Sequence, residues 1–266
     1  MKVLITDNIN KCVKDIISET AEAVFLPTMS EEEIIKIIGE YDALMVRSQT
    51  KVNRNIIEAG KKLKIIGRAG VGVDNIDVNS ATEKGIIVVN SPDGNTIAAS
   101  EHTIALMLAI SRNIVPASQS TKEGKWNRDA FTGTELFGKT LGVMGFGRIG
   151  RKVVNIALSI GMKVIVYDPF ANEETVNKAC ALYETSLDNF LKTLDYLSIH
   201  IPKTSDTINI INKENIKKMK KGAIIINCSR GGLVNENDLK DALENGQISA
   251  AAIDVYENEP KIETCP

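Results

Sequence analysis

Short runs rich in Val and Ile alternate with longer amphipathic segments along the chain. The apolar runs lack strict polar alternation, which is typical of strands buried on both faces of a parallel sheet. The predicted strands are Val3–Thr6, Ala23–Leu26, Ala43–Val46, Ile65–Ile66, Ile86–Val89, Thr140–Met144, Lys163–Tyr167, Tyr196–Ile199, Ala223–Asn227 and Ala250–Ile253. The predicted helices are Glu31–Ile38, Val52–Ala59, Asn95–Arg112, Ile149–Ile160, Asn212–Met219 and Glu236–Glu244. This order predicts an α/β architecture with parallel sheets.

The middle of the chain departs from this alternation. Asn95–Arg112 is long and mostly apolar, which predicts a buried helix suited to connecting two domains. The segment Asn113–Phe137 that follows has no clear period and carries the single tryptophan, Trp126. Because a loop this long within a compact domain usually has a function, we predict a dimerisation arm. The alternative is a surface excursion with a locally packed Trp126.

Length and composition narrow the class of protein. A chain of 266 residues exceeds the usual single domain, which favours two domains. Its net charge of −2 gives no general attraction to nucleic acids or anionic membranes. The four cysteines are scattered, as in proteins of reducing compartments. With neither a signal-peptide pattern nor an apolar stretch of about eighteen residues, we expect a soluble cytoplasmic protein.

A glycine-rich turn lies between a predicted strand and a predicted helix. Gly145, Gly147 and Gly150 form the pattern G-x-G-x-x-G, with Arg148 and Ile149 between the last two. In a dinucleotide site the first glycine permits the tight turn, the second admits the pyrophosphate and the third allows close packing of helix on strand. The helix N-terminus then offers free N–H groups to the phosphates. The alternative is a glycine-rich turn without a ligand.

An acidic residue follows at the expected place. Asp168 ends the next predicted strand, eighteen positions after Gly150 (168 − 150). A carboxylate there can accept hydrogen bonds from the adenosine ribose and would repel a 2′-phosphate. The sequence therefore predicts NAD rather than NADP as the cofactor.

Five motifs together resemble the D-2-hydroxyacid dehydrogenase family, most closely its phosphoglycerate dehydrogenase branch. They are Leu44–Val52, Gly67–Asp77, Gly145–Gly150 with Asp168-Pro169, Asn227–Gly232 and Asp254–Pro260. The resemblance implies two Rossmann-like or flavodoxin-like parallel-sheet domains with the active-site cleft between them. Residues 1–93 would form the substrate-binding domain and residues 94–266 the NAD-binding Rossmann domain.

The resemblance also implies two catalytic residues. Arg230 and Glu259 are twenty-nine positions apart (259 − 230), a spacing like that of the family's catalytic arginine and glutamate. Arg230 follows a strand, and its guanidinium can hold a carboxylate and polarise a carbonyl. Glu259 resembles the glutamate that orients the catalytic histidine. The alternatives are an ordinary loop ion pair for Arg230 and an exposed acidic cluster with Glu257 for Glu259.

Substrate residues are expected in the first domain. Arg47, with Ser48 beside it, and Arg68 lie just after predicted strands, and in this branch the corresponding arginines face the substrate and its phosphate. Two arginines are a good match to a phosphate dianion. Gly70, Val71 and Gly72 would present backbone N–H groups to the substrate carboxylate. Alternatively, the arginines pair with Asp42 or Asp74 and the glycines form only a turn.

The resemblance assigns further residues to the cofactor and none to a metal. These cofactor residues are Pro169, His200, Pro202, Thr207, Cys228 and Asp254. His102 lies inside a predicted helix, where we expect a packed or structural residue rather than a catalytic one.

The family's catalytic histidine comes later, in a Pro-His-x-Gly segment beyond the glutamate. The sequence ends at Pro266, before such a segment, and so before the helix that completes the substrate domain. We expect the native chain to continue. If it does not, the enzyme would be badly impaired, because loss of a general base costs roughly two to four orders of magnitude.

By resemblance, the reaction is the NAD-dependent oxidation of 3-phospho-D-glycerate to 3-phosphohydroxypyruvate, the first step of serine biosynthesis. The expected state is a homodimer or higher homo-oligomer, with a small-molecule substrate as its partner and no nucleic acid or membrane. Two alternatives stay open. One is another 2-hydroxyacid dehydrogenase, such as a glyoxylate or hydroxypyruvate reductase, and the other is a non-catalytic NAD-sensing scaffold.

Overall fold

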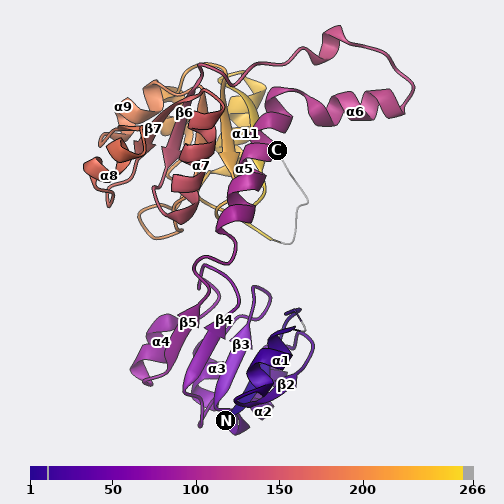
Figure 1. Cartoon of the computed structure of the whole chain (residues 1–266), viewed down its shortest axis with the longest axis vertical. Helices are drawn as coiled ribbons and strands as arrows, with labels where there is room; N and C mark the ends of the chain where they lie inside the picture. Colours follow the sequence, from indigo (N-terminus) through magenta and orange to yellow (C-terminus); the bar gives the residue numbers. More distant parts are fainter. Residues whose placement is uncertain (11, 260–266) are drawn as a thin grey trace. The chain divides into compact units, whose positions relative to one another are not determined.

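The computed structural model describes residues 1–10 and 12–259. The chain divides into two compact units, Met1–Asn95 and Thr96–Pro266, a boundary two residues beyond the one expected from the sequence. Each unit has its own sheet and its own apolar core (Figure 1).

The first unit is built on a parallel five-stranded sheet. Its order is β2-β1-β3-β4-β5, with neighbours in register as at Val3↔Ala43 and Ile66↔Val88. The elements are β1 (Lys2–Ile5), α1 (Cys12–Ser18), β2 (Glu22–Phe25), α2 (Glu31–Ile37), η1 (Ile38–Glu40), β3 (Ala43–Val46), α3 (Arg54–Ala59), β4 (Ile65–Arg68), α4 (Val78–Glu83) and β5 (Ile87–Asn90). This is the flavodoxin-like strand order, in which the chain direction across the sheet reverses between β1 and β3. The carboxyl ends of β1 and β3 are therefore where such a sheet binds ligands.

The second unit is built on a parallel six-stranded sheet of order β11-β10-β9-β6-β7-β8. Its strands are β6 (Thr140–Met144), β7 (Lys163–Tyr167), β8 (Leu182–Tyr183), β9 (Tyr196–Ile199), β10 (Ala223–Asn227) and β11 (Ile248–Ile253). Its helices are α5 (Thr96–Ser111), α6 (Ile114–Lys122), η2 (Asp129–Phe131), α7 (Arg148–Ser159), α8 (Glu173–Lys178), α9 (Leu187–Lys192), α10 (Lys213–Lys218) and α11 (Glu236–Glu244). Read from β8, this is the 3-2-1-4-5-6 order of the Rossmann fold, whose reversal lies between β6 and β9.

The predicted α/β class with parallel sheets is confirmed, and local chemistry explains the differences in helix bounds. The helix expected over Val52–Ala59 begins only at Arg54, because Val52 forms a buried bridge to Ile76. The Asn53 side chain then caps the helix by accepting from the Ile56 N–H. The short elements α1, α4, β8, α8 and α9 were not predicted, since each contributes too few core residues to leave a periodic pattern.

Helix α5 is only partly buried, contrary to expectation. One side packs inward through residues such as Thr103, Ile104 and Met107, whereas Ile97 and Leu108 are exposed. After α5 the chain runs out from the body of the second unit through α6 and returns to β6 (Figure 1). The alternative of a locally packed Trp126 is wrong, because 82% of that residue is exposed.

Candidate active site

The glycine-rich turn connects β6 to α7 at the reversal point of the second sheet. Gly145 has a left-handed φ of 99°, and a Cβ there would come within 2.6 Å of the His200 carbonyl oxygen. A Cβ on Gly150 would overlap the Gly145 carbonyl oxygen, so the helix can pack this closely only with glycine. A Cβ on Gly147 would meet nothing within 4 Å. Gly145 and Gly150 therefore serve the packing of the turn, and Gly147 borders open space.

The start of α7 suits an anion. Gly147 is the N-cap residue, and no side chain caps the helix there. The first N–H groups of an α-helix have no partner within the helix and carry the positive end of its dipole. With open space in front of Gly147, the turn fits the pyrophosphate of a dinucleotide.

Asp168 lies against this turn. One carboxylate oxygen, Oδ2, accepts a hydrogen bond of 2.7 Å from the Phe146 N–H. The other, Oδ1, accepts one of 2.8 Å from the Phe170 N–H. Asp168 thus couples the end of β7 to the glycine-rich turn. The Phe170 side chain beside it is 97% exposed, which no sequence pattern indicated.

His200 follows β9 and is held in its neutral form. Its Nε2 lies 2.7 Å from the Ser198 hydroxyl, and burial lowers its pKa to about 4. In the loop that follows, the Thr207 hydroxyl donates to the Pro202 carbonyl at 2.7 Å. Thr207 therefore stabilises this loop. Because His200 stays neutral, it is better suited to contacting a cofactor than to acting as a charged catalytic imidazole.

Cys228 and Asp254 lie together beyond the ends of β10 and β11. Burial raises the pKa of the Cys228 thiol, while a hydrogen bond with Thr103 of α5 acts in the opposite direction and the nearby Asp254 charge adds to the rise. The Asp254 carboxylate is 3.4 Å from Nε2 of His102, whose side chain is 47% exposed. His102, which was expected to be a packed or structural residue, is thus partly exposed and lies beside a predicted cofactor residue. Its neighbour Asp254 is remote in sequence, so no local pattern reveals the pair.

Arg230 projects from a rigid turn after β10. The Asn227 side chain donates to the Arg230 carbonyl at 3.0 Å and accepts from the Ser229 N–H at 3.0 Å. The Ser229 hydroxyl in turn donates to the Ile201 carbonyl at 2.7 Å, which ties this turn to the loop after β9. The Arg230 guanidinium donates to the Ser229 carbonyl at 2.8 Å. The backbone that carries Arg230 is thus fixed from both sides.

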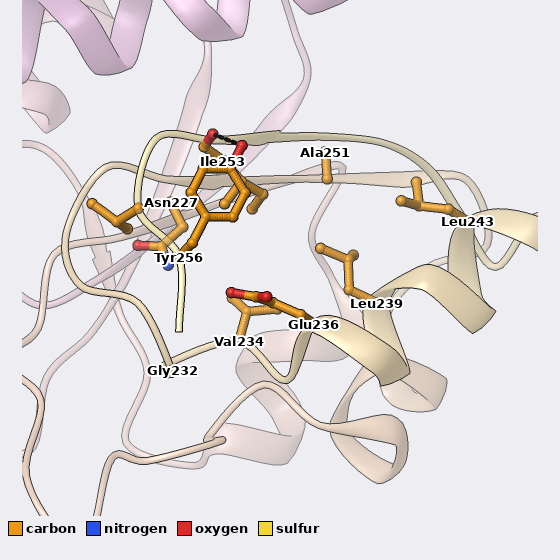
Figure 2. A pocket seen from close by; sticks show the side chains of 10 residues that line it. Asn227, Gly232, Val234, Glu236, Leu239, Leu243, Ala251, Ile253 and Tyr256 are labelled. Carbon is orange, nitrogen blue, oxygen red and sulfur yellow. Dashed lines mark hydrogen bonds between the residues drawn. The ribbon is translucent and has the colours of Figure 1, made fainter. Parts of the chain in front are cut away.

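Glu259 closes the turn after β11. Its Oε1 accepts a 2.8 Å hydrogen bond from the Tyr256 N–H, so it caps its own loop. Pro260, the next residue of the motif, lies outside the described residues. Beneath the loop is an apolar pocket of roughly 170 Å³ between β10, β11 and α11. Figure 2 shows the Tyr256 ring over this pocket, with its hydroxyl bonded to the Ile253 carbonyl at 3.1 Å.

The first unit has an open pocket of roughly 640 Å³ at the carboxyl edge of its sheet. Arg47, Ser48, Arg68 and Gly70 all line it, whereas Val71 and Gly72 do not. The remaining lining residues are Val13, Met45, Gly67, Ala69, Val89, Asn90, Ser91, Gly94 and Asn95. Asn90, which ends β5, and Ser91, which follows it, were not predicted as pocket residues, although their position at the same sheet edge could have indicated them.

The two arginines are held differently. The Arg47 guanidinium donates to the Asn8 carbonyl at 2.9 Å. The predicted alternative partner Asp42 instead accepts from the Lys2 N–H and lies 3.9 Å from the Lys64 ammonium. The Arg68 guanidinium packs directly on Gly70, where a Cβ would overlap it. A side chain at position 70 would therefore displace Arg68.

Comparison with known proteins agrees with these motifs. The family described as D-isomer specific 2-hydroxyacid dehydrogenase, NAD binding domain, matches residues 104–266. The chain belongs to the D-isomer specific 2-hydroxyacid dehydrogenase family. The family resemblance predicted from the sequence is thus confirmed.

The chain is similar in sequence or structure to several dehydrogenases and reductases. It is 52% identical over 260 residues to D-3-phosphoglycerate dehydrogenase of Synechocystis sp., covering 97% of this chain and 47% of the relative. It is 49% identical over 232 residues to hydroxypyruvate reductase of Thermotoga maritima, covering 87% and 74%. The crystal structure of D-lactate dehydrogenase from Aquifex aeolicus, complexed with NAD and lactic acid, superposes with a TM-score of 0.88 at 31% identity, covering 97% and 78%.

The dehydrogenase chain spans about half the length of the phosphoglycerate dehydrogenases it matches. Its second unit is the part that matches an NAD-binding domain. Among the described residues, no helix is long and apolar enough to cross a membrane. Within residues 1–10 and 12–259, no group of three or more His, Cys, Asp or Glu side chains could hold a metal ion.

Proposed function

We propose that this chain catalyses the NAD-dependent oxidation of 3-phospho-D-glycerate to 3-phosphohydroxypyruvate, the first step of serine biosynthesis. The observation that carries the proposal is the pocket of the first unit, where Arg47 and Arg68 both line one open space at the end of adjacent strands. Membership of the family indicates that the reaction is the oxidation of a 2-hydroxy acid, and the pocket supports a phosphorylated substrate.

The pocket favours an anion with two negative charges. A phosphate dianion offers several acceptor oxygens, and guanidinium groups bind such oxygens through paired, charge-assisted hydrogen bonds. The Ser48 hydroxyl and the Asn90 amide add neutral donors to the same lining. A substrate without the phosphate has no dianion for these two guanidinium groups to bind, so they would add nothing to its affinity.

The second unit would hold the cofactor. The open space before Gly147 and the start of α7 suit the pyrophosphate, and Asp168 at the end of β7 would face the adenosine ribose. When bound, NAD accepts a hydride from the substrate carbon that carries the hydroxyl group. His200, Cys228 and Asp254, at the carboxyl ends of β9 to β11, would line the same site.

Arg230 would hold the substrate carboxylate and polarise the oxygen that becomes the carbonyl. As the hydride leaves carbon 2, the hydroxyl loses its proton to a base and the C=O bond forms. In the family this base is the histidine that follows the glutamate. Glu259 would orient that histidine and favour its protonated form after proton transfer.

A second candidate follows from the Thermotoga maritima relative, because hydroxypyruvate reductases act on an unphosphorylated acid. The Arg47 and Arg68 pair favours the phosphorylated substrate. A non-catalytic NAD-sensing scaffold is not favoured, because it would have no use for the rigid turn that presents Arg230.

Substitution of the pocket arginines tests the proposal. In the full-length protein, Arg47→Ala and Arg68→Ala should each raise KM for 3-phosphoglycerate about ten- to hundredfold, since each loses charge-assisted bonds worth roughly 1.5–3 kcal/mol. Arg54→Ala is the matched control, because this exposed arginine of the same unit pairs with Glu83 at 2.9 Å and does not line the pocket. Unchanged KM in both pocket variants would refute the phosphate site and favour an unphosphorylated hydroxy acid.

A further inference from the structure

A buried carboxylate lies behind the pocket of the first unit without lining it. Asp7 directly follows Thr6 at the end of β1 and is only 7% exposed. Its φ of 64° lies in the left-handed region, which costs free energy for a residue with a Cβ. A buried charge in a strained backbone persists only where its surroundings hold it in place.

The Asp7 carboxylate is bonded to the loop that follows β3. Its Oδ2 accepts from the Arg47 N–H at 2.7 Å and from the Thr50 N–H at 3.2 Å. Its Oδ1 accepts from the Thr50 hydroxyl at 2.5 Å. One side chain just after β1 therefore fixes both ends of the segment 47–50, which carries Arg47 and Ser48.

The backbone of Asp7 contributes as well. Its left-handed turn leads into Asn8, whose carbonyl accepts the 2.9 Å hydrogen bond from the Arg47 guanidinium. Asp7 thereby fixes Arg47 at two points. Its carboxylate holds the Arg47 backbone N–H, and its backbone places the Asn8 carbonyl that holds the Arg47 guanidinium. Asn75 secures the other side of the segment, donating to the Arg47 and Thr50 carbonyls at 2.6 and 2.7 Å.

We propose that Asp7 is a positioning residue, whose carboxylate and left-handed backbone preform the 47–50 segment so that Arg47 and Ser48 are placed to bind an anionic substrate. The strand order explains the arrangement, because β1 and β3 are adjacent at the reversal point of the sheet, where ligands bind. Fixing the segment before the substrate arrives removes an entropic cost of binding. This inference rests on the proposed function, since it takes the pocket to be the substrate site.

Two substitutions at position 7 separate this role from a contribution to folding. Asp7→Gly removes the carboxylate but tolerates the left-handed φ, so the first unit keeps its backbone path. Asp7→Asn keeps an oxygen that can accept from both N–H groups, and its amide can donate to the Thr50 hydroxyl. Cys180→Gly is the matched control, because Cys180 has a φ of 59°, is exposed and lies in the second unit.

The experiment combines steady-state kinetics with hydrogen exchange of the full-length protein. Asp7→Gly should raise KM for 3-phosphoglycerate about tenfold while kcat and the Kd of NAD change little, as expected for lost substrate binding alone. It should also accelerate amide exchange of peptides covering residues 45–53. Asp7→Asn should restore most of the KM, and Cys180→Gly should change neither measurement.

The outcomes distinguish this inference from the proposed function. Unchanged KM in Asp7→Gly, or unchanged exchange at 45–53, overturns the positioning role even if 3-phosphoglycerate is the substrate. If the wild-type protein does not turn over 3-phosphoglycerate, the proposed function fails. The exchange of the 45–53 peptides then decides by itself whether Asp7 holds the segment.

Discussion

At the scale of single residues, the three glycines of the turn after β6 have distinct physical roles. Gly145 and Gly150 are required by the protein's own backbone, as the carbonyl oxygens of His200 and Gly145 leave no room for a Cβ. Gly147 has free space around it and a φ of −72°, which any residue can adopt. Folding therefore does not require glycine at 147, and the absence of a side chain there leaves room for a ligand.

This difference predicts opposite effects of two alanine substitutions. Gly150→Ala should lower the free energy of unfolding by about 1–3 kcal/mol, because the methyl group forces the start of α7 away from β6. Gly147→Ala should leave stability unchanged but raise the Kd of NAD about tenfold by filling the space before the helix. Urea unfolding and nicotinamide fluorescence measure the two effects. A Gly147→Ala variant that binds NAD normally would place the pyrophosphate elsewhere.

Asp168 should set the choice of cofactor. NAD(H) should bind well and NADP(H) poorly, because the carboxylate at the end of β7 would repel a 2′-phosphate. Asp168→Ala should narrow that preference and weaken both cofactors, since it also removes the acceptor of the Phe146 N–H that holds the turn. Fluorescence titration of both cofactors tests this. Equal affinities in the wild-type protein would contradict the assignment.

His200 predicts a dependence of stability on pH. Its folded-state pKa of about 4 lies below the unfolded value of about 6.5, so the unfolded state binds the proton more readily. The contribution of neutral His200 to the free energy of unfolding is therefore fully present above pH 6.5 and is lost as the pH falls toward 4. The loss is at most about 3 kcal/mol, and partial exposure of the residue makes it smaller. Urea unfolding of wild type and His200→Gln across this range should show a smaller loss in the variant. Identical dependences of stability on pH in the two proteins would contradict this role of His200.

Several site residues could be predicted singly, but their partners could not. Arg47, Arg68 and Arg230 each follow an apolar run, so their place at a sheet edge was readable from the sequence. The contacts of Asp7 with Arg47 and of His102 with Asp254 depend on which strands and helices are adjacent. Strand order leaves no local trace in the sequence, and these roles appear only in the fold.

At the scale of elements, the long buried strands were predicted well and α6 was not. Strands β3, β6, β7, β9 and β10 have the predicted bounds because each contains a run of mostly apolar residues that marks it in the sequence. Helix α6 has no buried residue, so no apolar period marks it. Its exposed residues include Ile114 and Val115, at 52% and 70%. This surface supports the proposal that the segment 113–137 is a dimerisation arm.

The single tryptophan makes the arm testable. If the arm contacts a second copy, sedimentation equilibrium should give at least twice 29.0 kDa, and Trp126 emission should shift to shorter wavelength as concentration rises. Trp126→Arg should weaken the assembly by placing a charge in the contact. A monomer at micromolar concentration, with emission independent of concentration, contradicts the arm.

At the scale of the whole molecule, the chain carries two sheets with two kinds of binding surface. The first unit offers a pocket with two arginines, and the second offers a dinucleotide turn with Arg230 and Glu259 in the loops after β10 and β11. The α/β class followed from the alternation of apolar runs and amphipathic segments, and the family followed from the motifs and their order. The flavodoxin-like strand order of the first unit was implied only by the resemblance and not by any local pattern, because β1 and β3 are separated by α1, β2, α2 and η1 in the chain.

Selection of a phosphorylated 2-hydroxy acid by this protein is best tested with two substrates that differ only in the phosphate. With full-length protein and saturating NAD, kcat/KM should be measured for 3-phosphoglycerate and for D-glycerate by the absorbance of NADH. We expect a preference of about a hundredfold or more for 3-phosphoglycerate, since the two charge-assisted contacts together contribute at least about 3 kcal/mol. Equal values, or a preference for D-glycerate, would contradict it.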